Sequence, residues 1–166
     1  MEENTDKDII VLENSTKTNS TTRKREPVEG NFVQGELRNQ ELTTFFHNNQ
    51  ELLQDTKNQL SNYRTEDLYC ISYNDAKITA TNAEGKQVNL DSQLESFIKS
   101  YFFAVGAHNN PKVFINDESV RGYSSIDFSF RLPDNVNKGI RYSPEYRNEN
   151  WEHIEGDWYI YSEGLI

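Results

Sequence analysis

The stretch LDSQLESFIKSYFFAVG, residues 90–106, divides the sequence into parts of different structural character. Large apolar side chains recur at every third or fourth position within it, namely Leu94, Phe97, Ile98, Tyr101, Phe102 and Val105. That period predicts an amphipathic helix with one face on a protein core. Ser92 and Glu95 match a capping box at its start, and Gly106 supplies the stop signal at its end.

The chain after this helix is expected to be β-structure to its end. In SSIDFSFRL, residues 124–132, the apolar and polar side chains alternate without a break. This period of two places Ile126, Phe128, Phe130 and Leu132 inward and Asp127, Ser129 and Arg131 outward. Shorter strands are predicted in KVFIND, residues 112–117, and in GIRYS, residues 139–143, which follows a turn at residues 133–135.

The chain before this helix combines both kinds of structure. Between Glu41 and Tyr63, apolar residues at helical spacing predict one helix, with Leu42, Phe45, Phe46, Leu53 and Leu60 in the stripe and Asn49 and Thr56 interrupting it. Residues 68–90 then switch to period two, which places Tyr69, Ile71 and Tyr73 on one face of a strand. A second strand is expected around Ile78, so this region is predicted to be a β-meander.

These elements place the protein in the α+β class. The order helix, meander, helix and then about four strands predicts two main helices packed on a curved, mostly antiparallel sheet. Residues 32–166 form a single domain in this interpretation. Residues 1–31 contain no aromatic residue and are dominated by Asn, Ser, Thr and charged side chains, so we expect a disordered polar tail or tether.

The tail holds one apolar run, Ile9 to Leu12. Four residues are too few for a signal-peptide core or for a membrane span, which needs about 20 apolar residues. We therefore expect no direct insertion of this chain into a membrane.

The distribution of charge restricts the class of partner. The net charge is −10; the first 32 residues hold 7 acidic and 5 basic side chains, which leaves 20 and 12 in the remainder, a net charge of −8. An acidic domain repels phosphate backbones and anionic lipids, so nucleic-acid binding is not expected. The charge suits solubility or a basic partner.

Cys70 is the only cysteine, which excludes a disulfide within the chain and a zinc ribbon. Its neighbours in DLYCISY alternate as in a strand. This context favours a buried thiol that packs as a small apolar side chain over a catalytic nucleophile.

The stretch NWEHIEGDWYIYSEG, residues 150–164, is the strongest candidate for a functional site. Gly156 and Asp157 fit the two-residue turn of a hairpin, which would pair Glu155 with Trp158, Ile154 with Tyr159, His153 with Ile160 and Glu152 with Tyr161. Ile154, Tyr159 and Tyr161 would then share one face. The other face is our candidate interaction face, formed by Trp151, His153, Trp158 and Ile160.

Neither a metal site nor a catalytic site is expected in this hairpin. His153 and Glu155 would share a face while Glu152 points away, which leaves two ligands where zinc needs three or four. The sequence contains no GxSxG, GxxxxGK or GxGxxG motif. We therefore assign no catalytic residue, no metal ligand and no cofactor.

Residues 139–164 resemble the ends of small uncharacterised proteins of Gram-positive bacteria. The likeness rests on GIRYSPE, a polar loop and then WEHIEGDWYIYSEG, in which a YSP turn precedes a hairpin rich in tryptophan and tyrosine. Several of those proteins are lipoproteins. The resemblance implies an extracytoplasmic, lipid-tethered protein if a signal segment was removed before Met1, and a cytoplasmic protein otherwise.

Three functions remain open at this stage. The first is a non-enzymatic binding module tethered at the bacterial cell surface, which uses exposed aromatic side chains against an unknown protein or small ligand. The second is an intracellular acidic inhibitor, such as an immunity protein or phage antagonist, of a basic toxin or nuclease. The third is a hydrolase whose site has no recognisable motif.

Overall fold

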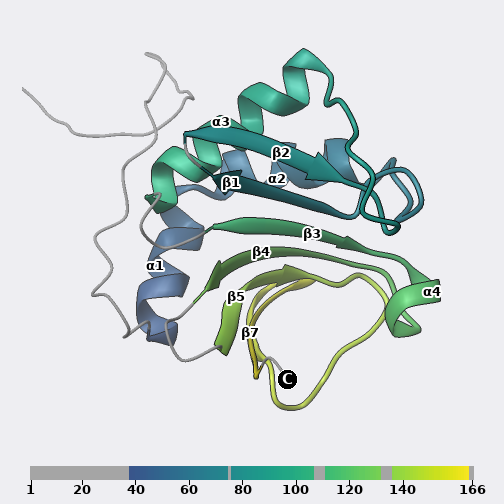
Figure 1. Ribbon diagram of the computed structural model, residues 1–166. Coiled ribbons are helices and arrows are strands. Elements are labelled where there is room, and N and C mark those ends of the chain that lie inside the picture. Colours follow the sequence, from purple (N-terminus) through teal and green to yellow (C-terminus); the bar gives the residue numbers. More distant parts are fainter. Residues whose placement is uncertain (1–37, 75, 107–110, 132–135, 165–166) are drawn as a thin grey trace, which may run out of the picture.

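A computed structural model describes residues 38–74, 76–106, 111–131 and 136–164, and Figure 1 shows their arrangement. The expected tail over residues 1–31 lies outside these ranges, as do Leu132 and the turn at residues 133–135. The described chain forms a seven-stranded sheet with helices packed on one face. The predicted α+β fold with an antiparallel sheet is confirmed.

Three longer helices and one short helix are present in the described ranges. They are α1 (Asn39–Asn48), α2 (Gln50–Leu60), α3 (Ser92–Val105) and α4 (Glu118–Arg121). The single helix predicted between Glu41 and Tyr63 is therefore two helices. Asn49 separates them, because its φ of −125° and ψ of 24° are not helical, and its buried side chain donates a hydrogen bond to the carbonyl of Phe45.

Helix α3 is where the sequence placed it, but its cap differs. Asp91, not Ser92, is the N-cap residue, and its carboxylate accepts a hydrogen bond from the backbone N–H of Leu94 at 2.9 Å. Ser92 is the first helical residue. Asp91 satisfies one of the free N–H groups at the start of the helix and places a negative charge at its positive end.

The strands are β1 (Cys70–Asn74), β2 (Lys77–Thr81), β3 (Lys112–Asn116), β4 (Ser125–Arg131), β5 (Val136–Tyr142), β6 (Glu152–Glu155) and β7 (Trp158–Gly164). Their order in the sheet is β2-β1-β3-β4-β5-β7-β6, and every neighbouring pair is antiparallel. β7 therefore lies inside the sheet, and β2 and β6 are its two edges. Figure 1 shows α1, α2 and α3 on one side of the curved sheet.

We call the sheet face under α1, α2 and α3 the inner face. It supplies the main core, in which the alternating apolar side chains of the strands pack against the helices. The fully or nearly fully buried strand residues of this core include Ile71, Val113, Ile126, Phe128, Phe130, Ile140, Trp158 and Ile160. Tyr101 of α3 packs between strand and helix rings, with its ring centroid 5.2 Å from that of Phe128.

Two predicted side-chain positions near β1 differ from the structure. Tyr69 does not share a face with Ile71 and Tyr73, because its ring packs against Phe114 at a centroid distance of 5.8 Å on the opposite face of the sheet. Cys70 is half-buried at the start of β1, and burial raises the pKa of its thiol. A raised pKa keeps this thiol protonated, as expected of an unreactive cysteine.

None of the helices in the described ranges is both long enough and apolar enough to span a bilayer.

Candidate functional site

The four residues predicted to form one interaction face are divided between two faces of the sheet. Trp158 and Ile160 lie on the inner face and are 3% and 2% exposed, with the Trp158 ring packed on Phe46 of α1. Trp151 and His153 lie on the opposite face, where both rings pack on Tyr159. The predicted face therefore does not exist as a continuous surface.

A bulge in β6 explains part of the difference. Glu155 pairs with Trp158 as predicted, but His153 pairs with Tyr159 and Glu152 with Ile160, one residue away from the predicted register. The extra residue lies between His153 and Glu155 and shifts the strand by one position. The tight turn is present, with a φ of 55° at Gly156.

We call the face opposite the three helices the outer face. The sequence placed Asp127 and Ser129 on it, and both are 1% exposed. Other buried polar residues on this face are Asn116, Ser125 and Arg141. These polar side chains are buried on the outer face. Each of them therefore needs a hydrogen-bond or ion-pair partner within the protein.

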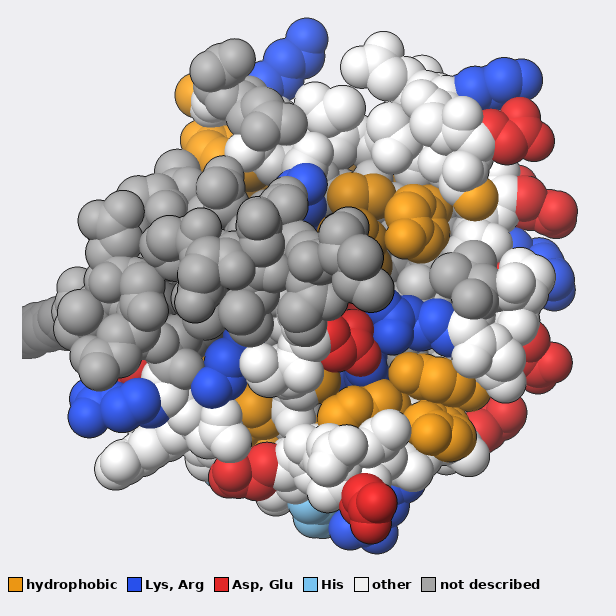
Figure 2. Space-filling model, turned by 60° about the horizontal axis from the view of Figure 1, so that its bottom comes forward, with side chains coloured by type: hydrophobic (Ala, Val, Ile, Leu, Met, Phe, Trp, Pro, Cys, Tyr) orange, Lys and Arg blue, Asp and Glu red, His pale blue; other side chains and the backbone are white. Residues whose placement is uncertain are grey.

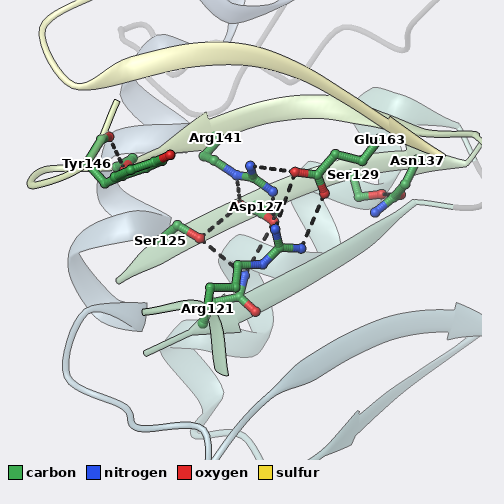
Figure 3. Close-up of polar contacts among 10 residues, drawn as sticks. Arg121, Ser125, Asp127, Ser129, Asn137, Arg141, Tyr146 and Glu163 are labelled. Carbon is green, nitrogen blue, oxygen red and sulfur yellow. Dashed lines mark hydrogen bonds and ion pairs between the residues drawn. The ribbon is translucent and has the colours of Figure 1, made fainter. Parts of the chain in front are cut away.

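An ion-pair network occupies the centre of the outer face (Figure 3). Asp127 and Arg141 are cross-strand partners in β4 and β5, and the Nε and Nη2 atoms of Arg141 each donate to one oxygen of Asp127 at 2.7 Å. The Nη1 atom of Arg141 donates to Glu163 of β7 at 3.0 Å. Arg121 of α4 contacts both oxygens of Glu163 at 3.3 Å. We call these four residues the outer-face network.

The pKa shifts of the network follow from burial and from these contacts. Burial alone lowers the pKa of Arg141, but its hydrogen bonds to Asp127 and the charge of that carboxylate raise it overall. Burial alone raises the pKa of Glu163, but hydrogen bonds and charge from Arg141, together with Arg121, lower it overall. The contacts of the network therefore favour the charged forms of Arg141 and Glu163.

Uncharged polar groups extend the network along β3, β4 and β5. The Nδ2 atom of Asn116 donates to Ser125 at 3.2 Å and to Asp127 at 3.3 Å. The hydroxyl of Ser129 hydrogen-bonds to the side-chain oxygen of Asn137. Tyr161 is 1% exposed, and its hydroxyl has no hydrogen-bond partner in the described part of the chain. Burial, followed by the charge of Asp127, raises its pKa, so the hydroxyl stays protonated.

Aromatic rings cover one side of this network. The guanidinium carbon of Arg141 lies 4.0 Å from the ring centroid of Tyr161 and 4.8 Å from that of Trp151, distances at which cation–π attraction operates. Trp151 also packs against Tyr123 and Tyr146, at centroid distances of 5.9 and 5.6 Å. The rings of Tyr123 and Tyr146 are stacked at 4.3 Å.

We call Tyr123, Tyr146 and Trp151 the aromatic surface. Tyr146 is 41% exposed, and within the described residues it is one of two large hydrophobic side chains that face solvent to this degree. The loop that carries it is held locally, because the hydroxyl of Ser143 donates to the carbonyl of Tyr146 at 2.6 Å. Figure 2 shows hydrophobic side chains gathered in the lower half of this side of the molecule, with charged side chains around them.

The ring of His153 is engaged within its own hairpin. Its Nε2 atom lies 2.9 Å from the carbonyl oxygen of Gly156, so the ring closes the hairpin turn. Across residues 38–74, 76–106, 111–131 and 136–164, no three side chains of His, Cys, Asp or Glu are grouped as a metal site would require.

The contacts of the outer-face network leave its two carboxylates poorly placed for proton transfer. Both oxygens of Asp127 accept from Arg141, and Glu163 is bound by two arginines, so neither carboxylate is available as a base. A general base needs a pKa near the working pH, whereas the pKa of Glu163 is lowered.

The sequence contained a signal for this network that periodicity did not use. An acidic residue in the middle of SSIDFSFRL and a basic residue in the middle of GIRYS face the same side of two successive strands. Aligning the two strands about their turn places Asp127 opposite Arg141, the register found in the structure. Arg121 lies in α4, just before β4, and Glu163 lies in β7, so the alignment of β4 with β5 carries no information about them.

Comparison of the chain with models of known protein families, with curated proteins and with solved structures gives no match.

Proposed function

We propose that the protein is a non-enzymatic interaction module that binds a partner through the aromatic surface. One observation carries the proposal: Tyr146 stays 41% exposed although its ring is stacked on Tyr123 at 4.3 Å in a locally hydrogen-bonded loop. Rigid tyrosine and tryptophan side chains are the residues that most often dominate binding energy at interfaces. They lose little conformational entropy on binding when they are already ordered.

A purely structural role explains Trp151 but not Tyr146. Trp151 lies 4.8 Å from the guanidinium of Arg141 and shields the buried network from water. The ring contacts of Tyr146 are with Tyr123 and Trp151, so it forms the outermost layer of the cluster. A ring in that position adds little to the protection of Arg141 and is free to contact a partner.

We place this module at the bacterial cell surface. The support is the resemblance of residues 139–164 to Gram-positive proteins, some of them lipoproteins, together with a polar segment over residues 1–31 whose composition suits a tether. The partner is a protein or a small ligand, and the aromatic surface is its expected contact.

The test compares three immobilised proteins: the parent, Tyr146→Ala and Phe103→Ala. Phe103 is the matched control, because it is the other exposed large hydrophobic residue in the described ranges and lies on α3. Each is exposed to an extract of the producing cells, and the retained proteins are identified by mass spectrometry. A partner that fits the proposal is purified and titrated by calorimetry.

We expect Tyr146→Ala to raise the Kd at least about tenfold, which corresponds to a loss of about 1.4 kcal/mol of binding free energy. Phe103→Ala should change the Kd by less than about twofold, and Tyr146→Ala should unfold in urea within about 0.5 kcal/mol of the parent. Equal binding of the purified partner by the parent and by Tyr146→Ala would refute the aromatic surface as the site.

The alternative function is an acidic inhibitor of a basic toxin or nuclease. Glu145 and Glu149 are exposed on the same loop as Tyr146, which supports a contact with a basic surface. Charge acts mainly on association and is screened by salt, so an inhibitor should lose most of its association rate between 0.05 and about 0.5 M salt. Binding governed by aromatic contacts should keep its dissociation rate over that range. A hydrolase is the function that this site supports least.

A further inference from the structure

A second apolar surface lies on the inner side of the sheet, between α3 and the β1–β2 hairpin. It is a groove of about 480 Å³ whose lining includes Tyr73, Ile78, Lys99, Phe102 and Phe103. The ring of Tyr73 contacts that of Phe102 at 5.5 Å, and Phe103 is 56% exposed on the rim. Its volume lies within the usual range of ligand pockets, roughly 300–1,000 Å³, so it has room for aliphatic side chains.

The groove borders β2, which lies at the edge of the sheet, so no strand among the described residues pairs along its outer side. The carbonyl of Ala80 points away from β1, because it accepts a hydrogen bond from Val88 at 2.9 Å. In a strand the N–H and C=O of one residue point to the same side, and the direction repeats every second residue. The N–H and C=O of Ile78 therefore also point away from β1. The isolated bridge between Thr81 and Gln87 lies at the other end of β2 and does not cover them. An extended segment can pair with this edge.

We propose that Ile9 to Leu12, within this same chain, occupies the groove and pairs with the edge of β2. This is the one run of four aliphatic residues in the polar segment before α1, and three of its members are β-branched, as strands prefer. In an extended segment, alternate side chains point to one face, so two of the four enter the groove and the backbone meets the edge of β2.

Charge and chain length both suit this occupant. Asp8 and Glu13 flank the run directly, whereas Lys99, which also forms an ion pair with Glu95 at 3.5 Å, lines the groove and Lys77 is exposed at the start of β2. Residues 13–37 join the run to α1. Roughly 25 residues span at most about 80 Å, and about 25–30 Å on average as a flexible chain. In Figure 1, α1 and the C-terminal end of α3 both lie at the left of the molecule.

The test uses the full chain and measures hydrogen exchange at the amides of Ile78 and Ala80 by NMR. The double variant Ile10→Asp/Val11→Asp places a charge on each face of the run. Thr16→Asp/Thr18→Asp is the matched control, because it adds the same charge to the same polar segment outside the run. We expect exchange at both amides to be at least tenfold faster in the first variant than in the parent, and unchanged in the control.

Two further variants test the groove itself. Phe103→Ala removes the exposed rim side chain, and Lys99→Glu reverses the charge of a side chain that lines the groove. Both should accelerate exchange at Ile78 and Ala80 severalfold, and the effect of Lys99→Glu should disappear at about 0.5 M salt. Glu84→Lys, which changes an exposed charge away from the groove, should leave exchange unchanged.

Two outcomes would overturn the proposal. The first is equal exchange at both amides in the parent and in Ile10→Asp/Val11→Asp. The second is protection that rises with protein concentration and accompanies a dimer in sedimentation, since the occupant would then be a second copy of the chain. Protection that is independent of concentration, is lost in the run variant and in the groove variants, and is kept in Thr16→Asp/Thr18→Asp and Glu84→Lys supports pairing within one molecule.

Discussion

Arg141 is the residue on which the outer face depends most. It is 0% exposed, with Asp127 and Glu163 as its anionic partners. We expect Arg141→Met to lower the free energy of unfolding by about 3–5 kcal/mol, because it leaves the carboxylate of Asp127 buried without a counter-ion. Urea denaturation followed by circular dichroism measures this loss.

Two control variants separate a charge effect from a packing effect. Asp127→Leu/Arg141→Met removes both charges and should recover much of the lost stability, because replacing a buried pair by apolar groups is often neutral. Arg121→Met removes a cation whose side chain is 31% exposed and should cost no more than about 1 kcal/mol. If the double variant is as unstable as Arg141→Met, the loss arises from packing and not from the uncompensated charge.

Glu163 makes the stability of the protein sensitive to acid. Burial alone raises its pKa, but Arg141 and Arg121 bring it below the ordinary value of 4.5. A carboxyl whose pKa is lowered by folding stabilises the folded state above its unfolded pKa, and that contribution is lost as the pH falls through the folded pKa. Glu163→Gln lacks this contribution at every pH.

The expected result is a difference between the parent and Glu163→Gln that is largest near pH 7 and shrinks as the pH falls below 4.5. Chemical denaturation of both proteins between pH 7 and about 3 measures it. Other carboxylates such as Asp117, whose pKa is also lowered, act equally in both proteins and cancel. A difference that stays constant over the whole range would mean that the charge of Glu163 contributes nothing to stability.

At the scale of single elements, the start of α3 offers a direct test of the capping assignment. Asp91→Ala should cost about 0.5–2 kcal/mol, because the N–H of Leu94 loses its acceptor and the helix loses a favourable charge. Asp91→Asn keeps an acceptor and should cost much less. Ser92→Ala should be nearly neutral, since Ser92 is the first helical residue. A larger loss for Ser92→Ala than for Asp91→Ala would restore the capping box predicted from the sequence.

The two edges of the sheet are protected to different degrees. β6 is short, carries exposed Glu152, His153 and Glu155, and contains a bulge. Charges and bulges on an edge strand oppose pairing with other chains. This effect explains why the hairpin carries acidic residues without assigning them to a binding or catalytic site. β2 carries one charged residue, Lys77, within the sequence KITAT, so it is the edge that accepts a strand more readily.

Elements with a strong local period could be predicted, and those decided by single backbone positions could not. α3 and β4 follow from spacing alone, because each apolar face is complete within its own segment. The break at Asn49 and the bulge in β6 each depend on one residue leaving regular geometry. The predicted interaction face was wrong as a surface for this reason, since a shift of one residue in a strand exchanges its faces.

At the scale of the whole molecule, the candidate site depends on which strands lie inside the sheet. Alternation in β4 predicted an outward side for Asp127, but did not predict that this side would be covered. The cover comes from outside the strand itself, for example from the loop after β5 that brings Trp151 over Arg141. The network and the aromatic surface are products of tertiary structure, so a local pattern predicts their residues only in part.

The inner and outer layers should unfold together, because β7 belongs to both. Trp158 and Ile160 of this strand lie in the inner core, while Tyr161, between them and Glu163, packs on Arg141 of the outer face. Two layers that share a strand inside the sheet cannot separate without breaking the sheet. This is the expected behaviour of a single cooperative domain, which the sequence predicts for residues 32–166.

The two tryptophans report on the two layers separately. In Trp151→Phe the remaining tryptophan is Trp158 in the inner core, and in Trp158→Phe it is Trp151 on the outer face. Within each variant we expect the urea midpoint from tryptophan fluorescence to equal the midpoint from circular dichroism, since coincident transitions are the signature of two-state unfolding. Comparison within one variant removes any effect of the substitution on overall stability. If Trp151 reports a lower midpoint than circular dichroism, the outer face opens before the sheet unfolds, and the aromatic surface is then a separate and less stable unit.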